Sequence, residues 1–253
     1  MDALKHVDEA GNGTPESIWE AWGGFDRLPE LRPDALVSPH GRALFVAPHP
    51  DDEVLGMGGL MVQLARLQRK LALVAVTDGD ASHRDSDIWT PDRLRAERPI
   101  ETREALQRLR AFNVEVARLR LGDGKVMQSE TALRDRLSRM LRPDDVVVTT
   151  WRFDGHPDHE ATGRAAAAAC LATGATLVEV PVWAWHWSSP ADSRLPWSRA
   201  RRLTLDSSTH ARKRHAIEAF ASQLEPDPST DNKAILEPEV LAHWVRPFEV
   251  FLV

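Results

Sequence analysis

The chain has 253 residues, enough for one large α/β domain with a substantial buried core. Its formal net charge of −6, with arginines interspersed among acidic residues, gives no support to a nucleic-acid or anionic-membrane partner. The single cysteine excludes an intrachain disulfide, no apolar run approaches the ~20 residues of a membrane span, and the N-terminus lacks a secretory signal, so we expect a cytoplasmic protein.

Apolar, β-rich runs alternate along the chain with helix-like segments. The runs cover residues 43–47, 71–77, 114–121, 146–149, 176–182, 202–205 and 248–253. The helix-like segments cover residues 53–69, 91–112, 130–141, 158–173 and 207–223. This alternation predicts βαβ units and a largely parallel sheet, with the last run as an antiparallel edge strand. Residues 1–40, polar and with one helical turn near Pro15–Trp22, are predicted to form an N-terminal extension before a single domain over residues 41–253.

A short phrase occurs twice, each time directly after a predicted strand. The first copy is His49-Pro50-Asp51-Asp52-Glu53, and the second is His156-Pro157-Asp158-His159-Glu160. Two further acidic loops, residues 77–80 and 121–124, follow the second and third strands. Ligands of open α/β sheets bind outside the carboxyl ends of the strands. We therefore expect the four loops to converge on one edge of the sheet.

The two phrases contain the donors of a mononuclear metal site. His49, Asp52 and His159 would supply two nitrogens and one oxygen, a set that suits zinc with one position left open for water. A single His-Pro-Asp is usually only a turn in which aspartate caps a helix. Two copies at strand ends favour the metal site over that simpler interpretation.

The remaining polar residues of the phrases suit catalytic roles. A metal lowers the pKa of its bound water to ~7, and Asp51 is placed to take the proton as general base. His156 fits a general acid or a group that stabilises an oxyanion. Asp158 is a candidate carboxylate behind a metal-binding histidine.

These motifs resemble those of the PIG-L/LmbE-like family of zinc-dependent N-acetylglucosaminyl deacetylases. The usual first motif is A-H-P-D-D-E, and here Pro48 separates the alanine from His49. The similarity covers residues 41–225 and includes Thr77-Asp78-Gly79, the helix carrying Arg98, Glu101 and Ala105, the loop 121–124 and the segment 213–223.

The resemblance implies a Rossmann-like three-layer αβα sandwich and hydrolysis of an N-acyl amide on a small-molecule amino sugar. It implies zinc, with Fe²⁺ or another divalent metal as an alternative, bound by His49, Asp52 and His159. It also implies Asp51 as the base, His156 as acid or electrostatic stabiliser, and Arg98 as a contact to a substrate hydroxyl. The chain has no tyrosine, so His156 and the metal would have to supply any oxyanion contact that a tyrosine makes in some relatives.

Nine tryptophans are unusual, and Trp183, Trp185 and Trp187 alternate just after the fifth predicted strand. If that strand continues, the three indoles lie on one face. They would then either stack on a sugar ring or pack against the N-terminal extension. With Asp123 of the loop 121–124, Trp185 and His186 are candidate substrate contacts.

The sequence therefore predicts a metal-dependent amide hydrolase, an N-deacetylase of an N-acetylated amino sugar in a small glycoside or glycoconjugate. One alternative is a metal-dependent phosphoester hydrolase, which would need a second metal bound through Asp78 or Asp123. Another is a non-catalytic sugar-binding relative. Residues 56–59 do not form G-x-G-x-x-G, which disfavours a dinucleotide site. Homo-oligomerisation remains open.

Overall fold

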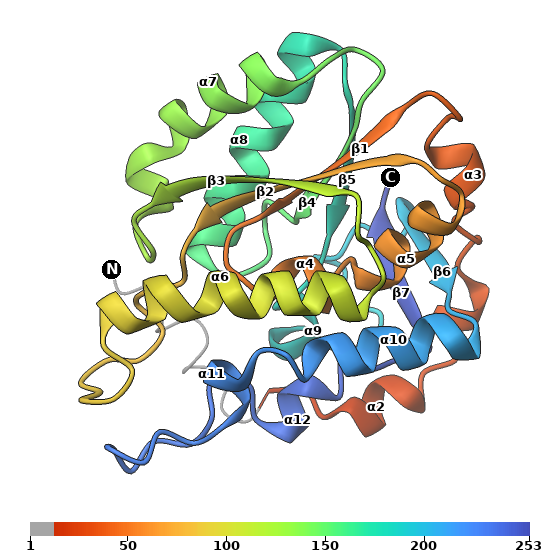
Figure 1. Ribbon diagram of the computed structural model, residues 1–253. Coiled ribbons are helices and arrows are strands. Elements are labelled where there is room, and N and C mark those ends of the chain that lie inside the picture. The colour runs from red at the N-terminus through yellow and green to blue at the C-terminus, as the bar shows by residue number, and fades with distance from the viewer. Residues whose placement is uncertain (1–12) are drawn as a thin grey trace.

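The computed structural model describes residues 13–253, and Figure 1 shows a twisted sheet between two layers of helices. Over these residues the sheet has seven strands in the order β3-β2-β1-β4-β5-β7-β6. The strands are β1 (Arg42–Ala47), β2 (Lys70–Thr77), β3 (Val114–Leu121), β4 (Val146–Thr150), β5 (Thr176–Val180), β6 (Ala200–Thr204) and β7 (Phe248–Leu252). All seven predicted strands are present, and the α/β fold with a mostly parallel sheet is confirmed.

Two hydrophobic cores, one on each face of the sheet, hold the helices. One face packs against α4 (Asp52–Leu55), α5 (Gly58–Arg66), α6 (Pro91–Arg108) and α10 (Ser207–Ile217). The other face packs against the 3-10 helix η2 (Val126–Ser129), α7 (Glu130–Met140) and α8 (Pro157–Thr173). These layers form the αβα sandwich (Figure 1). None of the helices within residues 13–253 is long and apolar enough to cross a membrane.

The shorter helices fall in two parts of the chain, before β1 and between β5 and β7. They are α2 (Glu16–Glu20), the 3-10 helix η1 (Phe25–Arg27), α3 (Pro33–Leu36), α9 (Ala184–Trp187), α11 (Ala221–Leu224) and α12 (Pro238–Leu241). Trp19 of α2, Phe25 and Trp185 of α9 form an aromatic cluster with ring centroids 5.4–5.7 Å apart. Of the predicted N-terminal extension, residues 13–40 thus pack on the domain. Residues 1–12 of that extension lie outside the described range. The division at residue 40 stays a prediction.

The strand order fixes where a ligand can bind. β1 pairs in parallel with β2 on one side and with β4 on the other. The chain therefore leaves β1 in one direction and returns to its other side at β4, so the crossover helices lie on opposite faces. At such a switch point the loops diverge and leave a crevice outside the carboxyl ends of the strands. Both His-Pro-Asp phrases begin there.

Two predicted features of the fold are wrong. β7 is antiparallel but lies inside the sheet between β5 and β6, so β6 takes the edge. Glu249 of β7 is buried, and its carboxylate accepts hydrogen bonds from the N–H groups of Gly59 and Leu60 and from Lys213 Nζ. These contacts cap the start of α5. The predicted continuous helix over 53–69 is accordingly two helices, α4 and α5.

The tryptophan segment also differs from the prediction. β5 ends at Val180, and residues 184–187 form the helical turn α9 rather than a continued strand. The backbone N–H groups of Val182, Trp183 and Ala184 bond to the carboxylate of Asp154, which removes them from the strand ladder. The helical turn then spreads the three indoles instead of aligning them on one face.

Candidate metal centre

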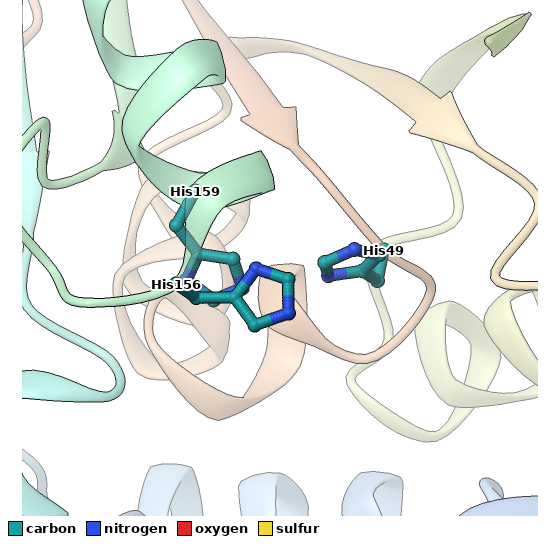
Figure 2. A group of neighbouring side chains, drawn as sticks. All are labelled: His49, His156 and His159. Atoms are coloured by element: carbon teal, nitrogen blue, oxygen red, sulfur yellow. The ribbon is translucent and has the colours of Figure 1, made fainter. Parts of the chain in front are cut away.

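The two phrases bring three histidines together at the switch point. Figure 2 shows His49, which follows β1, facing His156 and His159 at the start of α8. The ring centroids are 5.0 Å apart for His49 and His156, 5.3 Å for His49 and His159, and 4.7 Å for His156 and His159. One ring nitrogen of each lies within 4.8 Å of the other two. Residues more than a hundred positions apart thus form one cluster.

Close packing of α8 on β4 sets the position of the second phrase. Gly163 lies one turn after His159, and a Cβ atom on it would be 2.6 Å from the carbonyl oxygen of Thr150. Only glycine lets the first turns of the helix approach the strand end so closely. His159 is consequently fully buried.

Of the predicted ligands, Asp52 lies at ligand spacing from both His49 and His159. Asp52 Oδ2 lies 3.2 Å from His49 Nδ1 and 3.3 Å from His159 Nε2. Ligands bound at about 2.1 Å in a tetrahedral site are ~3.4 Å apart. His159 Nε2 is buried and makes no hydrogen bond, which is costly unless another partner occupies its lone pair. The predicted donor set therefore fits a divalent metal.

The outward nitrogens of both histidines face carboxylates. His49 Nε2 is 3.2 Å from Asp123 Oδ1 and 3.3 Å from Asp158 Oδ2, while His159 Nδ1 is 2.8 Å from Asp154 Oδ2. Such partners fix the tautomer and orientation of a metal-binding imidazole. Sequence reasoning found Asp158 but missed Asp154, which lies two residues before the second phrase. An aspartate after a buried strand was the available signal, but it also fits an ordinary turn.

Asp51 occupies strained backbone beside this group. Its φ is 121°, a region that side-chain-bearing residues rarely adopt and that recurs at functional sites. Its N–H donates to Glu53 Oε2 over 3.0 Å, and Arg98 Nη2 donates to its Oδ2 over 2.9 Å. Burial is the main cause that raises the pKa of Asp51 to about 8, although Arg98 acts against it.

His156 caps the N-terminus of α8. Its Nδ1 accepts a hydrogen bond from the N–H of Asp158 over 3.2 Å. Burial, followed by the charges of His159 and His49, lowers its pKa well below the usual value. The imidazole is therefore neutral near pH 7, and because Nδ1 is an acceptor, Nε2 carries the proton.

A protein-family model described as "PIG-L: GlcNAc-PI de-N-acetylase" matches residues 44–170, half of the chain and both phrases. The chain belongs to the PIG-L family. No curated protein matches it in a sequence search.

Solved structures of deacetylases share the PIG-L fold of this chain. The zinc-inhibited form of teicoplanin deacetylase Orf2 is 20% identical, with a TM-score of 0.61 over 83% of this chain and 97% of that one. The A40926 pseudoaglycone deacetylase Dbv21 is 22% identical, with a TM-score of 0.61 over 83% and 96%. A triple mutant of a deacetylase in teicoplanin biosynthesis is 25% identical, with a TM-score of 0.57 over 72% and 83%. At these identities the likeness establishes the fold.

The other segments that resemble PIG-L motifs hold the elements around Asp51 together through hydrogen bonds. Glu101 of α6 accepts hydrogen bonds of 2.7 Å from both the N–H and the Oγ of Ser222, which ties α6 to α11. Arg98, one turn earlier, is 2% exposed and also donates to the carbonyl of Gly79 over 2.9 Å. It thereby joins the Thr77-Asp78-Gly79 loop to Asp51. Its predicted contact with a substrate hydroxyl stays a prediction.

Of the remaining candidate residues, one lies at the candidate metal centre and the others make contacts elsewhere. Asp123 lies beside His49, as described above. Trp185 is 4% exposed and packs edge-on against Trp19 at 5.4 Å, so its indole is covered by α2 rather than free to stack on a sugar. His186 is buried next to Trp183, with ring centroids 6.0 Å apart. Asp78 forms an ion pair of 2.5 Å with Arg118 of β3.

Proposed function

We propose that this PIG-L protein is a metal-dependent N-deacetylase that hydrolyses the acetamide of an N-acetylated amino sugar in a glycoside or glycoconjugate. The buried group of His49, Asp52 and His159, with an unpaired Nε2 on His159, carries the proposal. The family description and the names of two structural neighbours, deacetylases of teicoplanin and of the A40926 pseudoaglycone, support the substrate class.

His49, Asp52 and His159 would bind the metal, zinc or another divalent ion such as Fe²⁺. When bound, the metal would activate a water molecule and polarise the amide carbonyl. The side chains around it then have to place one proton acceptor and one hydrogen-bond donor on the reacting amide. Asp51 and His156 meet these two needs.

Asp51 would accept the proton of the attacking water. Its Oδ2 is held by Arg98, which leaves Oδ1 for the proton. Without a metal ion, the pKa of Asp51 is about 8, near the range in which a general base works best. A nearby cation would lower this pKa. As the carbon–nitrogen bond breaks, the same proton can pass to the departing amine, which leaves acetate and a free amino sugar.

His156 would stabilise the developing negative charge on the carbonyl oxygen. Its Nδ1 is an acceptor for the Asp158 N–H, so Nε2–H is the donor that remains. A neutral donor aimed at an oxyanion is effective in a buried site because it needs no reorganisation. Of the two roles expected for His156, the hydrogen-bond donor is better supported than the charged acid.

Metal content and acetate release test the proposal. We expect one metal per chain and acetate release from at least one compound in a panel of N-acetylated sugars, glycolipids and glycosylated metabolites. Asp51→Asn should keep the metal and lose acetate release. A metal-loaded protein that releases no acetate from the whole panel would contradict it.

The phosphoesterase alternative has one observation in its favour. Besides the three histidines, His49, Asp123 and Asp158 form a group that could bind an ion. However, Asp158 Oδ2 and Oδ1 accept the N–H groups of Gly124 and Val126, and Asp123 Oδ2 accepts that of Ala81. Both oxygens of Asp158 accept backbone N–H groups, whereas only one oxygen of Asp52 does so, from His49, and this favours one metal. Two tightly bound metals per chain would reverse this preference.

A further inference from the structure

Asp154 is a buried carboxylate directly behind the deepest candidate ligand. It follows β4, is fully buried, and its Oδ2 lies 2.8 Å from His159 Nδ1. His49 has two carboxylates near its outward nitrogen, whereas Asp154 is the one carboxylate within 4 Å of His159 Nδ1 in the described part of the chain. The outward nitrogen of His159 therefore has a single carboxylate partner.

Backbone N–H groups from one segment hold Asp154 in place. Oδ1 accepts the N–H groups of Val182 and Ala184 over 2.8 and 3.0 Å, and Oδ2 accepts that of Trp183 over 2.9 Å. The indole N–H of Trp187 donates to the carbonyl of Asp154 over 2.7 Å. Burial raises the pKa of Asp154, while these hydrogen bonds act against it in favour of the ionised carboxylate and fix its orientation.

The segment before β1 braces these donors in turn. Trp19 Nε1 donates to the carbonyl of Trp185 over 3.0 Å. Thr14 donates from its N–H to the carbonyl of His186 over 2.8 Å and from its Oγ1 to that of Ser188 over 2.6 Å. A continuous set of hydrogen bonds thus runs from Thr14 and Trp19 through α9 to Asp154 and His159.

We infer that Asp154 is the positioning residue of the metal centre, and that the Trp183–Trp187 segment is the support that holds it. The inference rests on the proposed metal site. Asp154 keeps the proton of His159 on Nδ1, so that the lone pair of Nε2 points at the metal. The tryptophan segment then acts by holding Asp154 in place, and it needs no contact with the sugar.

Asp154→Asn tests this role because asparagine has the same shape but one acceptor oxygen. If its oxygen keeps Val182 and Ala184, its amide N–H₂ faces His159, which must then present a lone pair at Nδ1 and carry its proton on Nε2. We expect the dissociation constant for zinc, measured by chelator competition, to rise about 10–100-fold. An unchanged dissociation constant would overturn the inference.

Asp145→Asn is the matched control. Asp145 is also a buried aspartate next to β4, but at its other end, where it pairs with Arg42 at 2.5 Å. We expect this variant to lose stability and to bind zinc with wild-type affinity. If it weakens zinc binding as much as Asp154→Asn, the effect is general destabilisation and the inference fails.

Nuclear magnetic resonance of the zinc-loaded wild type gives a second readout that needs no variant to fold. The ring nitrogens of His159 should show a proton on Nδ1, slow to exchange and shifted downfield, and none on Nε2. A proton on Nε2 would overturn the inference. Failure of the proposed function is separate, because a protein that binds zinc through this pair but releases no acetate would refute the deacetylase and leave the role of Asp154 intact.

Discussion

The two His-Pro-Asp phrases have nearly the same sequence but opposite physical character. The first loop is strained at Asp51, where φ is 121°, and the side chain of His49 remains 11% exposed. The second begins a regular helix through a histidine cap, and His159 is fully buried. The strained loop carries the proposed base, and the relaxed helix start carries the ligand that packs most tightly.

This difference suggests that the two loops have different chemical roles. Strain is tolerated where surrounding contacts hold it, here the hydrogen bonds of Asp51 with Arg98 and Glu53. Burial suits a ligand whose geometry must not vary. The first loop would supply two ligands and the base, and the second would supply the ligand whose geometry is held most tightly.

Replacing His159 should have the largest effect. His159→Ala removes a direct ligand, so zinc affinity should fall by more than the ~10–100-fold typical of an outer partner, and activity should disappear with the metal. Metal content after dialysis against a zinc buffer measures this. A His159→Ala protein that kept stoichiometric zinc would show that the second loop is not the anchor.

Asp51→Asn should instead separate rate from binding. We expect kcat for acetate release to fall by about 10²–10⁴, with zinc content unchanged, because a general base contributes that much and Asp51 is not a ligand. Steady-state kinetics on zinc-loaded protein give the answer. Wild-type kcat would remove Asp51 from the mechanism.

The pH dependence of the metal-free and metal-bound forms should run in opposite directions. Burial lowers the pKa of His159, but Asp52 and Asp154 outweigh it and raise the pKa to about 9. A raised pKa stabilises the folded metal-free chain below the unfolded value of ~6.5, and that contribution is lost as the pH rises through about 9. Metal binding needs the unprotonated nitrogen, so zinc affinity should increase over the same range.

Melting temperature and zinc dissociation constant, measured from pH 6 to 9.5, test this relation. Burial also lowers the pKa of His49, but hydrogen bonds with Asp123, Asp158 and Asp52 outweigh it and raise the pKa well above its usual value. A slope near two decades of affinity per pH unit would mean that both loops release a proton, and a slope near one that a single loop does. An affinity independent of pH would contradict the expected protonation of His159.

The smallest expected effect concerns strain alone. Asp51→Gly should be more stable than Asp51→Ala by about 1 kcal/mol, because both variants lose the Arg98 contact and only glycine adopts this backbone freely. Urea unfolding of the two metal-free variants gives the difference. Equal stability would mean that the first loop is not strained in solution.

Much of the fold follows from local pattern. Strand and helix periods located every strand, and the repeated phrase pointed to His49, Asp52 and His159, which the structure brings together as the candidate metal centre. The position of β7 and the break between α4 and α5 depend on Glu249 meeting Gly59 and Leu60, which are far away in the chain. Asp154 could not be predicted for the same reason, because its role depends on hydrogen bonds from the distant N–H groups of residues 182–184.

The interior place of β7 has a consequence for the order in which the chain can mature during synthesis. The loop with His49 leaves the ribosome early, but the cap of α5 behind it waits for Glu249, about 200 residues later. At 5–20 residues per second, the first half of the candidate metal centre lacks part of its support for at least about 10 s. Uptake of the proposed metal, where it needs the finished support, would therefore follow the translation of residue 249.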